Sequence, residues 1–186
     1  TPKETIINLN LNIEETLLPR LYNFHPQSVL EIGCGFGRCL EKVYHQVRSI
    51  DRLVGVDLSS SMITRAKDYL NIFRGTDKIE LLQCDASKLP FSDGSFELSY
   101  SHVSLTHIPP ENIPTVTSEI SRVTTKYIVH IERYHYTGEH PTQHRCSHFL
   151  PDFYGKDWRL YESSRIEGHE EHYTVVWVFE KKESVK

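Results

Sequence analysis

The sequence has no long hydrophobic run. Its 186 residues contain no stretch of about 18 apolar residues, the length that a membrane-spanning helix requires. Its first residues show neither the basic start nor the apolar centre of a secretion signal. We therefore expect a cytoplasmic protein with no membrane partner.

Paired cysteines and an excess of basic charge are also missing. No Cys-x-x-Cys spacing occurs, so the cysteines are interpreted as reduced, small hydrophobic residues rather than a disulfide framework. The formal net charge is −4 with a pI of about 6.2, and lysine and arginine are scattered along the chain, which argues against nucleic-acid binding. The cysteines are Cys34, Cys39, Cys84 and Cys146.

A dinucleotide fingerprint is absent, although a glycine-rich turn is present. The segment Ser28-Val-Leu-Glu-Ile-Gly-Cys-Gly-Phe-Gly-Arg38 ends an apolar run with three glycines at alternate positions, and a helical pattern comes after it. Counted from Gly33 or from Gly35, the third glycine of Gly-x-Gly-x-x-Gly would fall on Arg38 or Leu40. Glycines packed between a strand and a helix let the backbone approach a ligand, so the turn predicts a nucleotide-like cofactor.

Strands and helices alternate along the chain. This alternation predicts an open, mainly parallel sheet with helices on both faces, in a single domain without repeats. Expected strands are 28–32, 53–57, 79–84, 96–101, 127–131, 158–163 and 173–179. Expected helices are 13–22, 38–50, one that Ser59 or Ser60 caps and that continues to Phe73, and one that Pro109 and Pro110 introduce.

Polar residues stand at the ends of several predicted strands, where open sheets of this class bind ligands. Asp57 ends the second strand and could accept two ribose hydroxyl hydrogen bonds. Asp85 comes after the third and could accept from an adenine amino group, and Ser101-His102 ends the fourth. Because a carboxylate at a strand end contributes little to a core, we expect Asp57→Ala to leave the fold intact.

Three segments together resemble a known family. Residues 29–37, 54–62 and 84–96 are similar to consecutive motifs of the small "type 11" class I S-adenosylmethionine (SAM)-dependent methyltransferases, and 119–123 resembles the helix before their fifth strand. The resemblance covers roughly residues 25–132. It implies a Rossmann-like, three-layer α/β fold with a mainly parallel seven-stranded sheet whose last strand is antiparallel. It also implies SAM as the cofactor and S-adenosylhomocysteine as the product.

The resemblance also implies a set of cofactor-binding residues. The first motif would lie along the methionine part of SAM, Asp57 would hold the ribose, and Met62 would pack near the adenine. Asp85 with Ala86 would recognise the adenine edge, and Ser101 with His102 would lie near the sulfonium. The full set is Glu31, Gly33, Cys34, Gly35, Gly37, Asp57, Leu58, Met62, Asp85, Ala86, Ser101 and His102.

Histidines supply the candidate general bases. A hydroxyl acceptor would need a base, and histidine serves at neutral pH. Residues 133–157 lack core periodicity and come after the fifth strand, so we expect them to cover the substrate within a single domain of residues 1–186. His140, His144 and His148 recur every four residues and could hold a metal with Cys146, but we expect none. The candidate catalytic residues are His107, His135, His144 and His148.

Several functions remain open at this point. The first is methyl transfer from SAM to a small-molecule acceptor with an O or N nucleophile. Others are methyl transfer to a protein or RNA, a non-catalytic SAM-binding partner domain, and an NAD-dependent oxidoreductase, which Arg38 in the third-glycine position disfavours. Two departures from the family pattern, Glu97 and the segment Val123-Thr-Thr-Lys126, lie outside the expected pocket. The sequence leaves the oligomeric state open.

Overall fold

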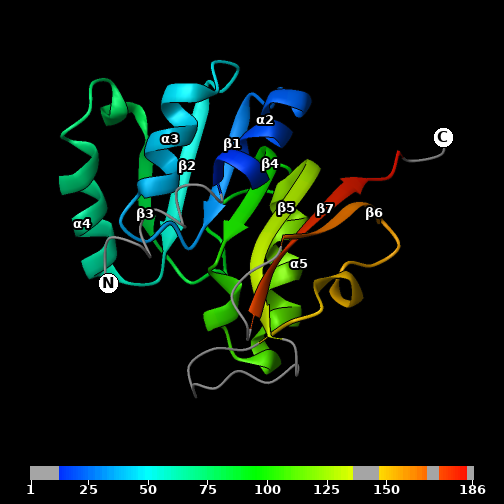
Figure 1. Cartoon of the computed structure of the whole chain (residues 1–186). Coiled ribbons are helices and arrows are strands. Elements are labelled where there is room, and N and C mark those ends of the chain that lie inside the picture. Colours follow the sequence, from blue (N-terminus) through cyan, green and yellow to red (C-terminus); the bar gives the residue numbers. More distant parts are fainter. Residues whose placement is uncertain (1–12, 136–146, 167–171, 184–186) are drawn as a thin grey trace.

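The computed structural model describes residues 13–135, 147–166 and 172–183. Seven strands form one sheet in the order β3-β2-β1-β4-β5-β7-β6 (Figure 1). The pairings among β1 to β5 are parallel, whereas β7 runs antiparallel to both β5 and β6. The strands are β1 Ser28–Ile32, β2 Arg52–Asp57, β3 Glu80–Gln83, β4 Phe96–His102, β5 Thr124–His135, β6 Trp158–Ile166 and β7 His172–Lys181. The predicted α/β fold with an antiparallel last strand is confirmed.

Helices cover both faces of the sheet and bury a core on each side. One core packs α2 (Leu18–Phe24), α3 (Arg38–Gln46) and α4 (Ser60–Leu70) against the sheet. The other packs α5 (Ile113–Val123) together with the short helices η2 (Leu105–His107) and η4 (Leu150–Phe153). Two further single turns are η1 (Thr76–Lys78) and η3 (Pro110–Asn112).

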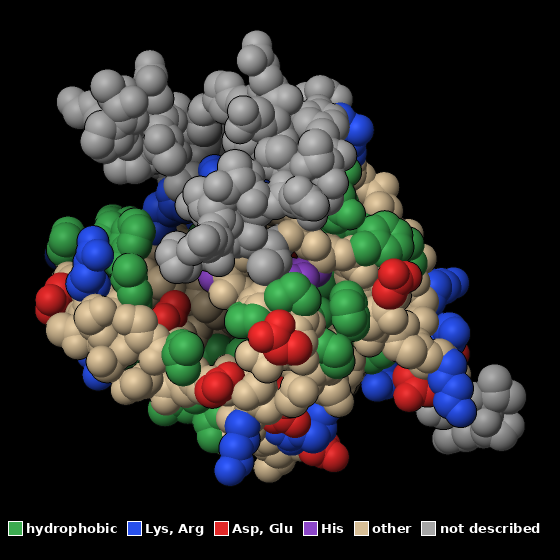
Figure 2. Space-filling view, turned by 90° about the horizontal axis from the view of Figure 1, so that it is seen from below, with side chains coloured by type: hydrophobic (Ala, Val, Ile, Leu, Met, Phe, Trp, Pro, Cys, Tyr) green, Lys and Arg blue, Asp and Glu red, His purple; other side chains and the backbone are tan. Residues whose placement is uncertain are grey.

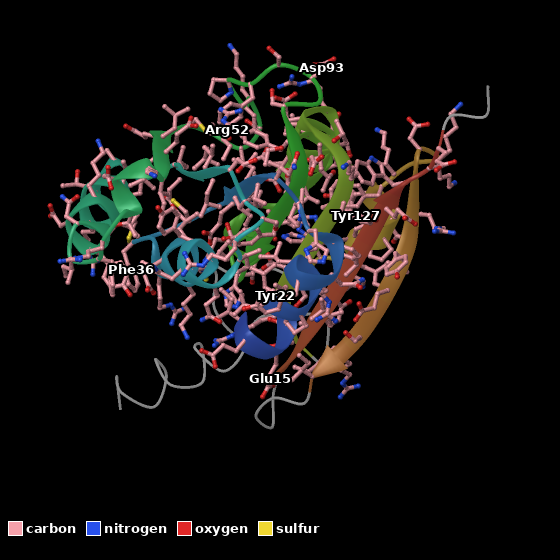
Figure 3. The ribbon with its side chains drawn as sticks, turned by 90° about the horizontal axis from the view of Figure 1, so that it is seen from above. Glu15, Tyr22, Phe36, Arg52, Asp93 and Tyr127 are labelled. Carbon is pink, nitrogen blue, oxygen red and sulfur yellow. The ribbon has the colours of Figure 1, made fainter. Side chains whose placement is uncertain are left out.

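The helix α2 lies across the middle of the sheet near its amino-terminal edge (Figure 3). Its Phe24 ring stacks on Tyr127 of β5 with ring centroids 3.9 Å apart. Residues 13–16, which precede α2, are also helical, and Pro19 stands in the first turn of α2, where proline is tolerated. The predicted leading helix is therefore present with an interruption at Leu17.

Some element boundaries differ from those predicted. The strand β5 is longer than 127–131 because its second half pairs with β7 as far as His135 opposite His172. The helix α3 ends at Gln46 rather than at residue 50, because the β-branched Val47 is already extended. In α4 the buried residues are Ile63, Ala66 and Leu70, and Met62 is only half-buried at the edge of this face.

The order of the strands places a switch point between β1 and β4. From β1 the chain moves outward to β2 and β3, then returns to β4 on the other side of β1. Open sheets bind ligands beyond the carboxyl ends of the strands at such a point. Among the described residues, no helix is long and apolar enough to cross a membrane.

Candidate functional site

Two neighbouring cavities open at the carboxyl ends of β1, β2 and β4. The larger has a volume of about 630 Å³ and the smaller about 270 Å³, and they share Gly33, Gly35 and Val103 in their walls. Figure 2 views the molecule from this end, where acidic, histidine and hydrophobic side chains meet. Of the predicted residues, the larger cavity is lined by Gly33, Gly35, Asp57, Leu58, Met62, Asp85, Ala86 and His107, and the smaller by Glu31, Gly33, Cys34, Gly35 and His102.

The three glycines of the turn are required for three different reasons. All have positive φ: +69° at Gly33, +54° at Gly35 and +85° at Gly37. A Cβ on Gly33 would lie 1.8 Å from the Ser104 hydroxyl, and one on Gly37 would lie 3.3 Å from Leu70 in the core. Among the described residues, a Cβ on Gly35 would meet nothing within 4 Å. Gly35 is therefore the position where a bare backbone faces the cavity.

Asp57, at the end of β2, links the glycine turn to the start of α4. Its Oδ2 accepts a hydrogen bond from the Gly35 N–H at 2.8 Å, and its Oδ1 accepts one from the Ser59 N–H at 2.8 Å. Ser59 in turn caps α4 by accepting from the Met62 N–H. Each carboxylate oxygen has a further lone pair, so Asp57 can hold the turn and still accept from a ligand.

The far wall of the larger cavity is built after β3. Asp85 is exposed, and its Oδ1 accepts a hydrogen bond from the Ser87 N–H at 2.8 Å. This bond lowers the pKa of Asp85, since it favours the ionised form. Leu58, which is 68% exposed, offers an apolar surface in the same cavity. Carboxylates beside apolar surface are suited to a ligand with hydroxyl or amino donors on a flat ring.

The smaller cavity holds two titratable groups that burial keeps neutral. Burial raises the pKa of Glu31 to about 8, although the Tyr100 hydroxyl donates to its Oε2 at 2.9 Å. Burial lowers the pKa of His102 to about 4, and its buried Nε2 finds no hydrogen-bond partner among the described residues. Arg38 and Arg133 also line this cavity. An anionic group of a ligand could pair with these arginines, and a ligand amino group could donate to the carbonyl oxygen of the neutral Glu31.

Two predicted cofactor residues do not line either cavity. Ser101 is fully buried, and its hydroxyl is 2.7 Å from Nδ1 of His130 and 2.6 Å from Oε1 of Glu132. Gly37 precedes the first residue of α3 and packs toward α4. Both residues contribute to the shape of the site from behind its surface.

The candidate bases fall in different places. His107 is exposed, stands at the end of η2 and lines the larger cavity. His148 is buried, with its Nε2 2.9 Å from the Ile108 carbonyl, and burial lowers its pKa. His148 is therefore packed behind η2 rather than in the cavity lining. His144 and the side chain of His135 lie outside the described residues, so their predicted roles stay predictions.

Metal binding finds no support in the part of the chain that the structure describes. There, no three histidine, cysteine, aspartate or glutamate side chains form a group that could hold an ion. His140, His144 and Cys146 lie outside the described residues. Cys34, Cys39 and Cys84 are free thiols, and burial raises the pKa of each, so they stay protonated.

Sequence reasoning missed several residues of the site. Val103 lines both cavities in a left-handed conformation, with φ of +52°, which no sequence pattern indicates for a β-branched residue. The cavity-lining Arg38 and Arg133 were also missed. Glu132, near the end of the longer β5, had a usable signal, because it is a charged residue directly after the apolar run of the fifth strand.

Comparisons with known proteins identify the family of the chain. The model of a family described as "Methyltransferase domain" matches residues 29–126, which is more than half of the chain. A malonyl-[acyl-carrier protein] O-methyltransferase of Halorhodospira halophila is 30% identical over 118 residues, covering 62% of this chain and 38% of that protein. A cycloartenol-C-24-methyltransferase of Arabidopsis thaliana is 33% identical over 84 residues, 45% of this chain and 24% of that protein. The chain spans less than half the length of these curated relatives.

Solved structures share the fold. A SAM-dependent methyltransferase from Methanosarcina mazei superposes with a TM-score of 0.71 at 20% identity, covering 91% of this chain and all (100%) of that one. The [4+2]-cyclase SpnF superposes with a TM-score of 0.73 at 16% identity, covering 95% of this chain and 81% of that one. The sheet order and the glycine turn are those expected of the matched family. The chain belongs to the methyltransferase domain family of class I SAM-dependent methyltransferases, whose cofactor is SAM.

Proposed function

We propose that this domain transfers a methyl group from SAM to a small-molecule acceptor, at an oxygen or nitrogen nucleophile. The observation that carries the proposal is the open space at Gly35, bordered by the carboxylates of Asp57 and Asp85 in one cavity. A bare backbone beside two strand-end acceptors fits a nucleoside, because its ribose and base bring hydroxyl and amino donors.

The residues of both cavities fit SAM. In the proposal, Asp57 would hold the ribose, and Asp85 with Ala86 would face the adenine between Leu58 and Met62. Glu31 and the glycine turn would hold the methionine part in the smaller cavity, where the buried His102 Nε2 lacks a partner in the described part of the chain. When bound, SAM supplies an activated methyl group on a sulfonium.

The protein's own task is to position the acceptor and, where the acceptor carries a proton, to remove it. Alignment of the reacting atoms at about 3–3.5 Å supplies much of the rate in such a transfer. His107 lines the larger cavity and has an exposed imidazole, so we propose it as the base for a hydroxyl acceptor. His135 and His144 stay candidates from the segment after β5, which we propose as the cover of the acceptor side. His148 would have to leave its contact with the Ile108 carbonyl to serve as the base.

The name of a cycloartenol-C-24-methyltransferase among the relatives supports a small acceptor. The malonyl-[acyl-carrier protein] O-methyltransferase differs from it in the accepting atom, and its name gives an acyl group that is carried on a protein. A carboxy-S-adenosyl-L-methionine synthase of Shewanella also matches, at 28% identity over 93 residues. The absence of a basic excess in the composition argues against a nucleic-acid acceptor.

Calorimetric titration tests the cofactor, with SAM, S-adenosylhomocysteine and NAD as ligands. We expect binding of the first two and none of NAD. Gly35→Ala should abolish binding, because its Cβ would occupy the ligand's space. Gly94→Ala is the control for a methyl group at a positive φ outside both cavities, and Gly155→Ala is the control for a methyl group in open surroundings. Normal binding by Gly35→Ala would show that the turn is only structural.

A second experiment tests the transfer itself. The fold also occurs in a protein described as a [4+2]-cyclase, so cofactor binding alone leaves a non-methylating role open. Incubation with SAM carrying a tritiated methyl group, against separate pools of metabolites, proteins and RNA, distinguishes the alternatives. Label in the metabolite pool supports the proposal. Label only in protein or RNA, or in none of the pools, contradicts it.

A further inference from the structure

Glu132 is a buried carboxylate that accepts four hydrogen bonds behind the cavity. Its side chain enters from β5, and the residue is 5% exposed. Its Oε1 accepts from the Ser101 hydroxyl at 2.6 Å and from the N–H groups of Leu105 at 3.1 Å and Ser104 at 3.3 Å. Its Oε2 accepts from the Thr106 N–H at 3.4 Å. One carboxylate therefore binds three successive backbone amides at the start of η2.

The segment that Glu132 holds begins with a strained residue. Val103 connects β4 to η2 with φ of +52°, a conformation that β-branched residues rarely adopt. Its N–H donates to the Ile131 carbonyl of β5 at 2.8 Å. Val103 lines both cavities, and Ser104 and His107 line the larger one. The wall of the site is thus a strained turn that needs an external restraint.

We propose that Glu132 is a positioning residue, whose carboxylate fixes the turn from Val103 to His107 as the wall of both cavities and thereby sets the affinity for the cofactor. The inference rests on the proposed function for its ligand. The restraint itself can be measured without any ligand. Glu132 lines neither cavity, so it acts through the turn and not by contact with the ligand.

A chain of polar groups supports the charge on Glu132. The Ser101 hydroxyl donates to Glu132, so its oxygen is available to accept from Nδ1–H of His130. The other ring nitrogen, Nε2, is 2.6 Å from the Tyr154 hydroxyl, which then donates to it. Burial lowers the pKa of His130 to about 3, so the ring is neutral and carries the single proton that this direction requires. Each hydrogen bond in this series is donated toward the carboxylate of Glu132, and hydrogen bonds aligned in this way strengthen one another.

The charge state of Glu132 should therefore control how firmly the turn from Val103 to His107 is held. Burial raises its pKa to about 7 against the opposing effect of its four donors, so the carboxylate gains a proton in mildly acidic solution. The groups that meet it are neutral: a hydroxyl from β4, backbone amides from η2, and Val175 as its register partner on β7. His130 on β5 stays neutral above its low pKa. His107 on η2 is present in wild type, Glu132→Gln and Ser99→Ala alike, so it cancels when these are compared at one pH.

Amide hydrogen exchange of the ligand-free protein tests the restraint. Glu132→Gln keeps the size but removes the charge and turns an N–H₂ toward amide donors, so exchange at residues 104–106 should accelerate at least tenfold at pH 8.5. Ser99→Ala is the control, because Ser99 makes a buried bond to Thr124 between the same two strands, away from the cavities. Equal protection of 104–106 in Glu132→Gln and wild type would overturn the proposal.

Should Glu132→Gln fail to fold, His107→Ala decides, because it keeps Glu132 and removes the other titratable side chain of the turn. After correction for intrinsic rates, protection of residues 104–106 in this variant should fall between pH 8.5 and pH 6 as Glu132 is protonated, with no such fall in the centre of β4. Unchanged relative protection would overturn the proposal.

Titration with S-adenosylhomocysteine tests the effect on binding. At pH 8.5, Glu132→Gln should bind about tenfold more weakly than wild type, and Ser99→Ala should bind like wild type. At pH 6 the ratio of wild type to Glu132→Gln should shrink toward one, because wild type is then mostly protonated. A purely structural loss would give the same ratio at both pH values and would overturn the link to affinity. If wild type binds no S-adenosylhomocysteine, the proposed function fails, whereas hydrogen exchange still decides the role of Glu132.

Discussion

Replacement of Asp57 should destabilise the protein as well as weaken cofactor binding. From the sequence alone, a strand-end carboxylate is expected to contribute little to folding. The structure instead shows both oxygens accepting backbone N–H groups at 2.8 Å, one from Gly35 and one from Ser59. Hydrogen bonds to charged groups stabilise by about 1.5–3 kcal/mol each, and a half-buried site takes the lower end. Asp57→Ala should therefore lower the free energy of unfolding by about 3 kcal/mol.

Asp57→Asn separates the charge from the geometry. Its one carbonyl oxygen can accept from either Gly35 or Ser59, while its N–H₂ group meets the other N–H unfavourably. The free energy of unfolding of Asp57→Asn should therefore lie between those of wild type and Asp57→Ala. A domain of this size loses about 2–4 °C in Tm per kcal/mol, so Asp57→Ala should melt about 6–12 °C lower.

Urea unfolding of the ligand-free variants measures the effect. Asp85→Ala is the matched control, because Asp85 lines the same cavity but is exposed and holds only its own loop through Ser87. Its cost should stay within about 0.5 kcal/mol, as for surface substitutions. S-adenosylhomocysteine affinity, measured well below both melting temperatures, should fall in both variants. A loss of stability in Asp57→Ala no larger than in Asp85→Ala would refute the reasoning.

Three further predictions concern single residues. The pKa of Glu31 is about 8 in the folded protein against 4.5 for an unperturbed glutamate, so its contribution to stability is complete below pH 4.5 and is lost as pH rises through 8. The unfolding free energy of wild type relative to Glu31→Gln should therefore fall by about 1.4 kcal/mol per pH unit between these two pKa values. A difference that does not depend on pH would contradict burial as the cause of the raised pKa. Gly33→Ala should lower the urea midpoint far more than Gly155→Ala, because its Cβ would lie 1.8 Å from the Ser104 hydroxyl, whereas the control meets nothing within 4 Å; equal midpoints would exclude the clash. His107→Ala should leave S-adenosylhomocysteine affinity within about threefold of wild type. It should reduce the rate of tritium transfer to a hydroxyl acceptor by about 10²–10⁴-fold, the usual contribution of a general base. An unchanged rate of transfer would remove His107 as the base.

The architecture was predictable because each element carries its own local signal. The run 28–32 is mainly apolar and the glycine turn follows it directly, so its strand was predicted with the observed bounds. The helix α5 shows the 3.6-residue period through Ile113, Val116, Ile120 and Val123, all of which are buried. The extension of β5 had no such signal, because it depends on pairing with β7, about 40 residues later in the chain.

The site was predictable where a residue acts by its own chemistry at a strand end. Asp57, Asp85 and His102 were found in this way and line the cavities. Ser101 was assigned to the cofactor because strand alternation alone does not say which face of β4 meets the cavity. The conformation of Val103 comes from tertiary restraint, and no local preference of valine predicts it.

Two carboxylates hold the walls of the site in the same physical way. Asp57 at the end of β2 binds the amides of Gly35 and Ser59, and Glu132 near the end of β5 binds three amides at the start of η2. Both sides of the cavity are thus positioned by charge acting on backbone N–H groups rather than by apolar packing alone. A core substitution such as Val43→Ala, in the buried face of α3, should therefore cost about 1–3 kcal/mol of stability yet leave cofactor affinity unchanged. Loss of either carboxylate should lower both the stability and the cofactor affinity, because the shape of the cavity depends directly on that carboxylate.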